Sequence, residues 1–332
     1  MVTVTGVGSL PGSDVREAVR VVLGELPELP YLPELPARGP AAAMTGRTLA
    51  LVPELGFDLQ PAGWRLTGGG SGSAGVDHRR ARSLLGQDLD ALEELAEGCA
   101  GPLKLQVAGP WTLAATVERP RGDRVLADVG ARRELAQALA LGVAEHVADV
   151  RRRVPGAVVL LQLDEPALPA VLAGQVPTAS GFHRHRSVDP PQASAALEEV
   201  LGAAADAGAE PLAHCCAADV PVGLLRGAGA RGVSLDATAL SPAAYDAIGE
   251  ALDAGDRLLL GVVPAVDPDP TPTTGAVVDR VQRLLDMLGH DPAEVSGQIV
   301  LTPACGLAGA GAAYAREVFK TLREAATAFP AS

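Results

Sequence analysis

"VVLLQLDE", residues 158–165, is a continuous apolar run that ends on two acidic residues. A run of this length predicts a strand buried on both faces, as in a parallel sheet. Segments rich in Ala, Leu, Glu and Arg separate it from seven further runs of the same kind, which are residues 3–8, 63–68, 103–109, 211–216, 232–237, 257–263 and 298–304. Strands that alternate with helices indicate parallel β-α units with right-handed crossovers. Eight units predict one α/β domain, a single (β/α)8 TIM barrel over residues 1–332, with an open three-layer sheet as the alternative.

Composition narrows the class of protein. The chain has 332 residues, is 48% hydrophobic and carries a formal net charge of −13. Its basic residues are scattered and form no stripe with aromatic residues, so we expect no nucleic-acid partner. We also expect neither a signal peptide nor a membrane span, because the start lacks a basic and apolar leader and no long apolar run occurs. Four cysteines are too few for a disulfide framework, which favours a reducing cytoplasm.

Polar residues interrupt the apolar runs at their C-terminal ends. Barrel enzymes carry their chemistry at this end of the strands, so the pattern predicts a site there. Asp164 and Glu165 are either an acid–base pair or buried side chains that cap the next turn. The polar residues in these positions are Ser9, Asp164, Glu165, His214, Cys215, Cys216, Asp236 and Cys305.

The sequence His214-Cys215-Cys216 is the most informative of these. Side chains alternate between the two faces of a strand, so His214 and Cys216 point the same way and Cys215 points oppositely, into packing. A His and a Cys that project together make half of a zinc site, and zinc needs two further N, S or O ligands or one ligand and an open position. Cys305, before a glycine at the end of the last strand, is the natural third ligand, and Asp236 is the nearest candidate for a fourth. A disulfide between the adjacent cysteines would be strained and is disfavoured.

Other chemistry-bearing residues have simpler interpretations. Cys99 is interpreted as a structural cysteine, because buried cysteines usually behave as small apolar residues. His183 and His185 flank arginines in a predicted surface loop, where they are solvated or contact an anionic substrate. Lys104 raises the alternative of a Schiff-base lysine, but it lies near the start of its strand, the stabilising end of a barrel, so this alternative is disfavoured.

Two loops stand out by composition. Residues 25–40 are Pro-rich and predict an ordered surface loop or a long β-α connection. Residues 67–75 are rich in Gly and Ser and follow the predicted second strand. They act either as a lid or as a disordered loop.

Six motifs occur together in one order along the chain. They are "GVGSLPGS" near the N-terminus, "VAGPWTL" (107–113), "LQLDEPAL" (161–168), "HCC" (214–216), "VSLDA" (233–237) and "TPACGL" (302–307). In this combination the chain resembles the catalytic C-terminal barrel of cobalamin-independent methionine synthase, which shares a superfamily with uroporphyrinogen decarboxylase. The resemblance extends from Gly8 to Cys305 and is closest to a stand-alone, core form of that enzyme.

The resemblance implies a metal site and a substrate site. It implies zinc ligands at His214, Cys216 and Cys305, and it puts Asp236 where the family has a glutamate ligand, one methylene longer. Ser9 stands where the family's Gly-Ser-x-Pro contacts the amino-acid substrate. Asp164 stands where the Asp of Asp-Glu-Pro-Ala meets the substrate amino group, and we expect Asp164 to be the catalytic residue and its neighbour Glu165 to share in substrate binding.

Some family features have no counterpart in this sequence. We find no Gly-Glu-x-x-Arg segment, which supplies a further glutamate to homocysteine in the family. The tryptophan that follows the Gly-Pro-x-Thr motif is also missing, and Trp111 stands inside the motif instead. A second, folate-binding barrel does not fit within 332 residues. The resemblance therefore bears more on the zinc and thiol half of the reaction than on the methyl donor.

The implied activity is a zinc-dependent transfer of a methyl group to the thiol of homocysteine. The donor is a methyl-folate or a methylated corrinoid protein. Two alternatives remain, a metal-free barrel enzyme like uroporphyrinogen decarboxylase and a non-catalytic barrel with a structural zinc.

Overall fold

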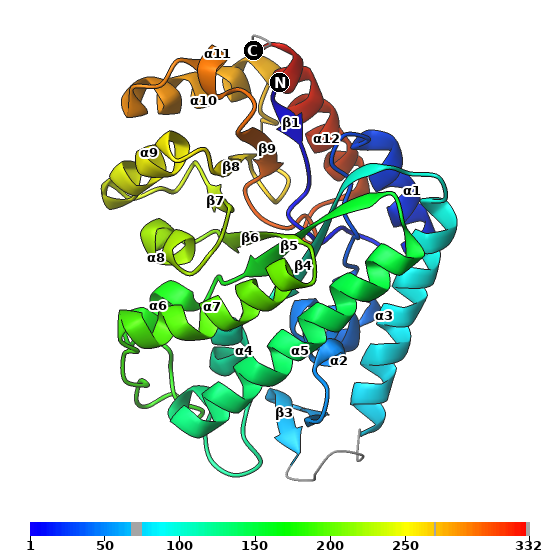
Figure 1. Ribbon diagram of the computed structural model, residues 1–332, viewed down its shortest axis with the longest axis vertical. Coiled ribbons are helices and arrows are strands. Elements are labelled where there is room, and N and C mark those ends of the chain that lie inside the picture. Colours follow the sequence, from blue (N-terminus) through cyan, green and yellow to red (C-terminus); the bar gives the residue numbers. More distant parts are fainter. Residues whose placement is uncertain (68–74, 269, 330–332) are drawn as a thin grey trace.

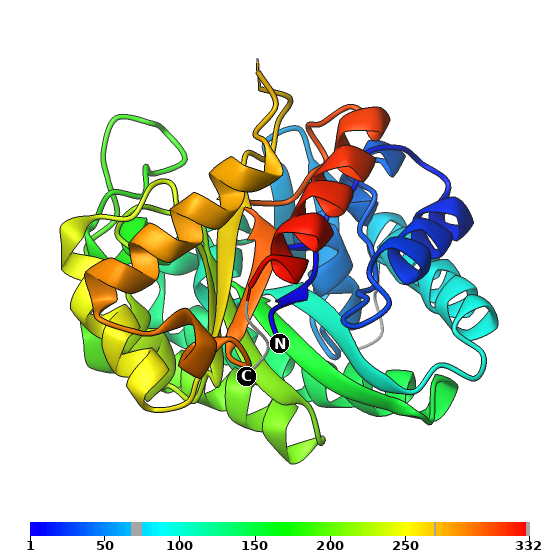
Figure 2. The ribbon, with the colours of Figure 1, turned by 90° about the horizontal axis from the view of Figure 1, so that it is seen from above.

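The centre of the protein is a curled, seven-stranded parallel sheet. The computed structural model describes residues 1–67, 75–268 and 270–329. The strands run in the order β1-β9-β8-β7-β6-β5-β4, with every neighbouring pair parallel. Figures 1 and 2 show the sheet curving around a central axis with helices outside it. Its strands are β1 (Thr3–Val4), β4 (Gly101–Ala108), β5 (Ala157–Asp164), β6 (Glu210–Cys215), β7 (Gly232–Asp236), β8 (Arg257–Val263) and β9 (Ile299–Pro303).

Seven of the eight predicted runs are therefore confirmed as strands of one parallel sheet, but the eighth is wrong. Residues 63–68 were expected in the barrel, whereas β3 (Gly63–Thr67) pairs antiparallel with β2 (Gly56–Gln60) in a separate hairpin. Figure 1 shows this hairpin at one end of the molecule, apart from the sheet. Its polar side chains pair across the two strands, because Asp58 accepts hydrogen bonds from Arg65. Such a half-polar surface does not belong in a strand buried on both faces.

The sheet is not a closed eight-stranded barrel. An extended segment, residues 30–34, lies between the stretch that follows β1 and the edge strand β4. Tyr31 forms an isolated bridge with Lys104, and Glu34 forms one with Ser9, both parallel. Pro30 and Pro33 lie in this segment and have no N–H to donate, so a regular ladder cannot form there.

Helices cover the outside of the sheet, as the alternating pattern predicts (Figure 2). Several begin at a side chain that accepts the first free backbone N–H groups; Asp14 accepts from Arg16 and Glu17, and Asp128 accepts from Ala131. None among the described residues is long and apolar enough to cross a bilayer. The helices are α1 (Val15–Glu25), α2 (Met44–Leu51), α3 (Val76–Leu95), α4 (Pro110–Thr116), α5 (Val129–Arg153), α6 (Leu168–Leu172), α7 (Pro190–Asp206), α8 (Val222–Gly227), α9 (Tyr245–Asp253), α10 (Thr274–Leu288), α11 (Pro292–Val295) and α12 (Ala312–Thr327).

The interior of the curled sheet changes character along its axis. Towards the N-terminal ends of the strands, Leu160, Leu212, Leu259 and Val300 form a small buried cluster with Leu29. Because side chains alternate, the next inward positions on the same strands fall two residues later. On β5, β6 and β9 these positions are the buried polar residues Gln162, His214 and Thr302, and on β8 the position is Gly261. The fold thus places polar groups above an apolar plug, towards the C-terminal ends of the strands.

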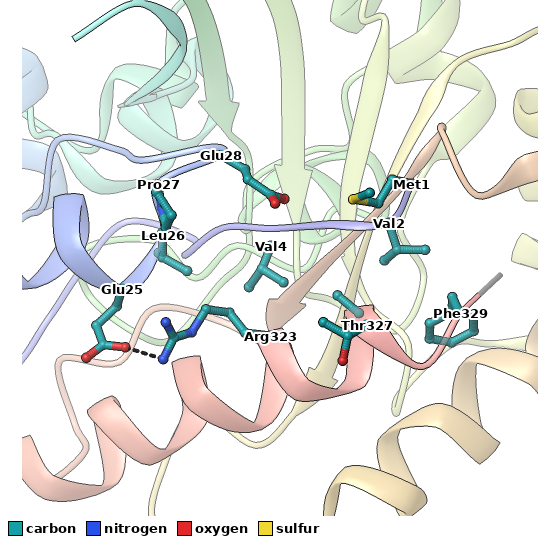
Figure 3. A pocket seen from close by; sticks show the side chains of 11 residues that line it. Met1, Val2, Val4, Glu25, Leu26, Pro27, Glu28, Arg323, Thr327 and Phe329 are labelled. Carbon is teal, nitrogen blue, oxygen red and sulfur yellow. Dashed lines mark ion pairs between the residues drawn. The ribbon is translucent and has the colours of Figure 1, made fainter. Parts of the chain in front are cut away.

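A cavity of about 360 Å³ lies at the opposite end, near the first residues of the chain and the last helix. Figure 3 shows that its lining is mostly apolar and that the charged groups Glu25 and Arg323 pair with each other at its edge. None of the residues predicted to form the site lines this cavity. The predicted site residues lie instead at the C-terminal ends of the strands.

The predicted lid falls almost wholly outside the described residues, because it spans residues 67–75 and residues 68–74 are not described.

Candidate functional site

Strand register brings two predicted residues of the rim, Asp164 and His214, onto neighbouring strands, together with Ser234, which the sequence did not single out. Asp164 at the end of β5 is the register partner of His214 on β6, and His214 is the partner of Ser234 on β7. Parallel neighbours end at the same edge of a sheet, so these side chains share one end of the interior.

Three of the predicted metal ligands form one group. One ligand atom from each of His214, Cys216 and Cys305 lies within 4.8 Å of the others. His214 and Cys216 come from the end of β6, and Cys305 follows β9, two strands beyond the neighbouring β7. The curl of the sheet therefore brings together residues that sequence separation alone keeps far apart.

His214 is oriented as a ligand would be. Its ring is buried, and Nδ1 lies 2.9 Å from the hydroxyl oxygen of Ser234. With the proton on Nδ1, Ser234 accepts this hydrogen bond and the lone pair of Nε2 is left available. Nε2 has no hydrogen-bond partner among the described residues. A buried nitrogen without a partner is costly, and a hydrogen bond that fixes the other ring nitrogen is typical of metal-binding histidines.

The two thiols of the group act on each other. The sulfur atoms of Cys216 and Cys305 lie 3.5 Å apart, and neither residue forms a disulfide. The hydrogen bond with Cys216 and the neighbouring His214 together lower the pKa of Cys305 to about 4, against the opposing effect of burial. The same hydrogen bond and burial raise the pKa of Cys216. The thiolate is the form that binds a metal, so the arrangement favours one ready sulfur ligand before any metal arrives.

Cys215 and Asp236 lie outside this group. Cys215 is fully buried in the main hydrophobic core, which confirms the prediction that it packs. Asp236, expected as the fourth ligand, turns its carboxylate to Thr238, which donates from its backbone N at 2.8 Å and its hydroxyl at 2.7 Å. The group of three offers a metal ion one nitrogen and two sulfur ligands.

Ser9 lies against the segment that carries Cys305. Its carbonyl oxygen accepts a hydrogen bond from the Leu307 N–H at 2.8 Å, and its hydroxyl oxygen accepts from the Ala308 N–H at 3.3 Å. Gly306 is required at this contact, because a Cβ there would lie 2.2 Å from the Ser9 hydroxyl oxygen. The N-terminal Gly-Ser motif and the C-terminal Cys-Gly motif are therefore parts of one wall.

Asp164 completes the polar end of the interior. Its side chain is 5% exposed and accepts a hydrogen bond from Gln162 at 2.7 Å. Burial raises the pKa of Asp164 to about 7, although His214 acts in the opposite direction. A carboxyl group poised near neutrality is suited to binding a cation or to moving a proton.

The sequence around this site matches a known protein family. The family described as cobalamin-independent synthase, catalytic domain, matches residues 102–328. The chain belongs to this family. The match includes Asp164 and the whole His214, Cys216 and Cys305 group. A search of curated proteins found no match.

The chain was also compared with solved protein structures. A B12-independent methionine synthase from Shewanella sp. W3-18-1, solved with selenomethionine, has 14% identity and a TM-score of 0.62, with 98% of this chain and 97% of that chain covered. A 2,3-dimethylmalate lyase has 13% identity and a TM-score of 0.42, with 97% and 80% covered. At such low identity, the first likeness supports the fold alone.

Glu165 differs from its neighbour Asp164 in what it contacts. It is fully buried, and its carboxylate accepts hydrogen bonds from the backbone N–H groups of Trp111 and Thr112 and from the Thr112 hydroxyl, at 2.7–2.9 Å. Gly109 allows this close approach, because a Cβ there would lie 2.2 Å from the carboxylate. Glu165, which we expected to bind substrate, is thus hydrogen-bonded to the start of α4, whereas Asp164 faces the interior.

Glu34 is a candidate that the sequence did not single out. It is buried, its backbone bridges to Ser9, and its carboxylate accepts a hydrogen bond from Gln106 at 3.3 Å. Burial raises the pKa of Glu34, and Arg47, 3.8 Å away, acts against this effect. The sequence carries no signal for Glu34, because it lies in the Pro-rich stretch 25–40 and prolines argue against a strand at residues 30–34. The synthase-family chain therefore has a second interior carboxylate near Ser9.

Proposed function

We propose that this chain is a zinc-dependent methyltransferase that transfers a methyl group to the thiol of homocysteine. The observation that carries the proposal is the group of His214, Cys216 and Cys305, in which the buried Nε2 of His214 has no partner among the described residues. Membership of the cobalamin-independent synthase family supports the reaction class. The related Shewanella structure, solved with selenomethionine, supports an amino acid of this shape as the ligand.

The donor set fits zinc better than a hard cation. Two sulfur atoms and one imidazole nitrogen suit zinc, whereas magnesium and calcium require oxygen ligands. When bound, zinc would deprotonate the thiol of the substrate and keep its sulfur nucleophilic at neutral pH. His214, held by Ser234, and the sulfurs of Cys216 and Cys305 are the residues that would hold it.

The carboxylates of Asp164 and Glu34, together with Ser9, would bind the amino-acid end of the substrate. The pKa of Asp164 is raised to about 7 by burial, and an arriving α-ammonium group favours the charged carboxylate. Glu34 offers a second acceptor for the same ammonium group, next to Ser9. Binding at two ends, sulfur and ammonium, fixes the direction in which the sulfur faces the donor, and such positioning contributes much of the rate in group transfer.

The donor carries an activated methyl group, and we propose a methyl-folate or a methylated corrinoid protein. In either case the substrate sulfur forms a bond to the methyl carbon while the bond to the donor breaks. We propose that the catalytic unit is one α/β domain over residues 1–332. We also propose the reducing cytoplasm as its compartment, because the two free thiols of the site stay reduced there.

The test begins with the metal content of the purified protein. We expect stoichiometric zinc in the natural protein and its loss in Cys216→Ser and Cys305→Ser. Cys99→Ser is the matched control, because Cys99 is exposed and outside the group. Full zinc occupancy in both variants would contradict the ligand assignment.

Zinc-edge X-ray absorption then separates catalytic from structural zinc. Addition of homocysteine is expected to add one sulfur to the zinc coordination shell. An unchanged spectrum would mean that the metal only stabilises the fold, and the proposed methyl transfer would be wrong. A natural protein purified without zinc and unable to bind added zinc would instead favour the metal-free decarboxylase-like alternative.

A further inference from the structure

Lys104 is a lysine in an unusual place. It is one of two lysines in the chain and is fully buried inside the curled sheet, on β4. Its ammonium nitrogen donates to the carbonyl oxygen of Val7 at 2.9 Å and to the side-chain oxygen of Gln106 at 3.4 Å. It also lies 5.2 Å from the centre of the Tyr31 ring. Lysine is almost never fully buried without a charged partner, so its retention here calls for a reason.

The charges that act on Lys104 are the carboxylates of Asp164 and Glu34, which the proposed function assigns to substrate binding. Burial lowers the pKa of Lys104 to about 8, and Asp164 and Glu34 oppose this effect by favouring the charged ammonium. No direct ion pair within 4 Å joins Lys104 to either carboxylate in the described parts of the chain. Lys104 acts on them instead through neutral side chains that lie between.

One branch of this network leads to Asp164. The carbonyl oxygen of Val7 accepts hydrogen bonds from both Lys104 and Gln162, each at 2.9 Å. The same amide nitrogen of Gln162 donates to Asp164 at 2.7 Å. Lys104 therefore anchors the backbone two residues before Ser9 and, through it, the side chain that orients Asp164.

A second branch leads to Glu34. Lys104 donates to the oxygen of Gln106, which fixes the amide so that its nitrogen faces the other way. That nitrogen donates to the Leu32 carbonyl oxygen at 2.7 Å and to the Glu34 carboxylate at 3.3 Å. Replacing the ammonium by an apolar group would remove the donor to the Gln106 oxygen, and with it one of the contacts that hold this amide against Glu34.

We propose that Lys104 is a positioning residue for the amino-acid end of the substrate, acting from the interior of the sheet on Asp164, Glu34 and the segment that carries Ser9. This inference rests on the proposed function, because it assumes that an α-ammonium group binds at these carboxylates. It gives the buried lysine a role in recognition rather than in covalent chemistry. A Schiff base would need an accessible amine, and here the amine is enclosed and hydrogen-bonded.

The test compares two ligands that differ only in the group that Lys104 is proposed to serve. One is L-methionine, and the other is 4-(methylthio)butanoate, which lacks the α-amino group. Binding of each to the zinc-loaded protein is measured by titration calorimetry. In Lys104→Met we expect methionine to bind about tenfold to hundredfold more weakly, as for the loss of a hydrogen bond to a charged group, and the analogue to bind within about twofold of its natural affinity.

Two controls separate positioning from damage to the fold. Tyr31→Phe changes the same neighbourhood but removes only a buried hydroxyl that has no partner among the described residues, so both affinities should be retained. Gln162→Leu cuts the Asp164 branch without touching Lys104, and it should also weaken methionine selectively. It provides the same comparison if Lys104→Met does not fold.

The outcomes distinguish the two proposals. If the natural protein binds neither methionine nor homocysteine, the proposed function is wrong. If it binds methionine but Lys104→Met and Gln162→Leu weaken both ligands equally, or lose zinc as well, Lys104 is structural and the positioning role is overturned. Selective loss of methionine at unchanged zinc stoichiometry supports it.

Discussion

Replacement of Glu165 by Gln tests whether this carboxyl group anchors α4. Burial raises the pKa of Glu165 from 4.5 to about 7, and the hydrogen bonds from Thr112 and Trp111 only partly oppose that effect. The folded state therefore holds a proton that the unfolded state has already released between these two values. Stability from this group is fully present below pH 4.5 and is lost as the pH rises through about 7.

The size of the effect follows from the same two values. A pKa raised from 4.5 to about 7 corresponds to about 3 kcal/mol between fully protonated and fully ionised forms. Glutamine does not titrate, so the free-energy difference between the natural protein and Glu165→Gln should shrink by about 2 kcal/mol from pH 5 to pH 8. The comparison cancels every other titrating group that the two proteins share.

Urea unfolding at several pH values is the assay. At pH 5 we expect Glu165→Gln to be less stable, because the amide presents N–H groups to backbone donors that need an acceptor. Glu198→Gln, on the exposed face of α7, is the control for the change of side chain. A stability difference that stays constant or widens with pH would refute the reasoning. Zinc content unchanged in Glu165→Gln would further separate the anchor from the metal site.

Three other predictions follow from the geometry of the site. In zinc-stripped protein, the lowered pKa of Cys305, about 4, should make its alkylation by iodoacetamide nearly independent of pH between about 6 and 8; mass spectrometry that shows a steep rise across this range would contradict it. Gly306→Ala should cost about 1–3 kcal/mol in urea unfolding and displace Ser9, because the new Cβ would overlap its hydroxyl; Gly309→Ala, where the nearest atom is 3.4 Å away, is the control, and equal stabilities would count against this wall. Asp236→Ala should retain stoichiometric zinc by metal analysis, because the carboxylate is held by Thr238; loss of the metal would mean that Asp236 leaves Thr238 to complete the site.

The parts of the fold that the sequence predicts are those whose hydrophobic pattern has one meaning. The run 158–165 is apolar on both faces, and in the structure it is β5, which pairs with a strand on each side. The run 63–68 is also rich in β-forming residues, but β-propensity does not say which sheet a strand joins, and the polar Asp58 and Arg65 pair only in space. Residues 30–34 show the opposite case. Their prolines argue against a strand, but contacts with distant segments hold them in an extended conformation.

The site divides in the same way. Period-two alternation is enough to separate His214 and Cys216 from Cys215, and the end of the last strand is enough to select Cys305. The sequence does not separate Glu165 from Asp164 in this way: both are expected at the substrate, and the contact of Glu165 with the start of α4 is visible only in the structure. Glu34 could not be found this way, because its place beside Ser9 depends on a bridge between segments without a shared pattern.

The large separation along the chain between Cys216 and Cys305 has a consequence for how the protein folds. Cys216 and Cys305 are 89 residues apart in the chain, and the strands that precede them are separated in the sheet by β7 and β8. A metal ion bound by both residues would cross-link the C-terminal third of the molecule. It could be bound by both only after that third has folded. Metal uptake would then report that folding is complete, and a chelator would be expected to loosen β6 to β9 before it disturbs β4 and β5.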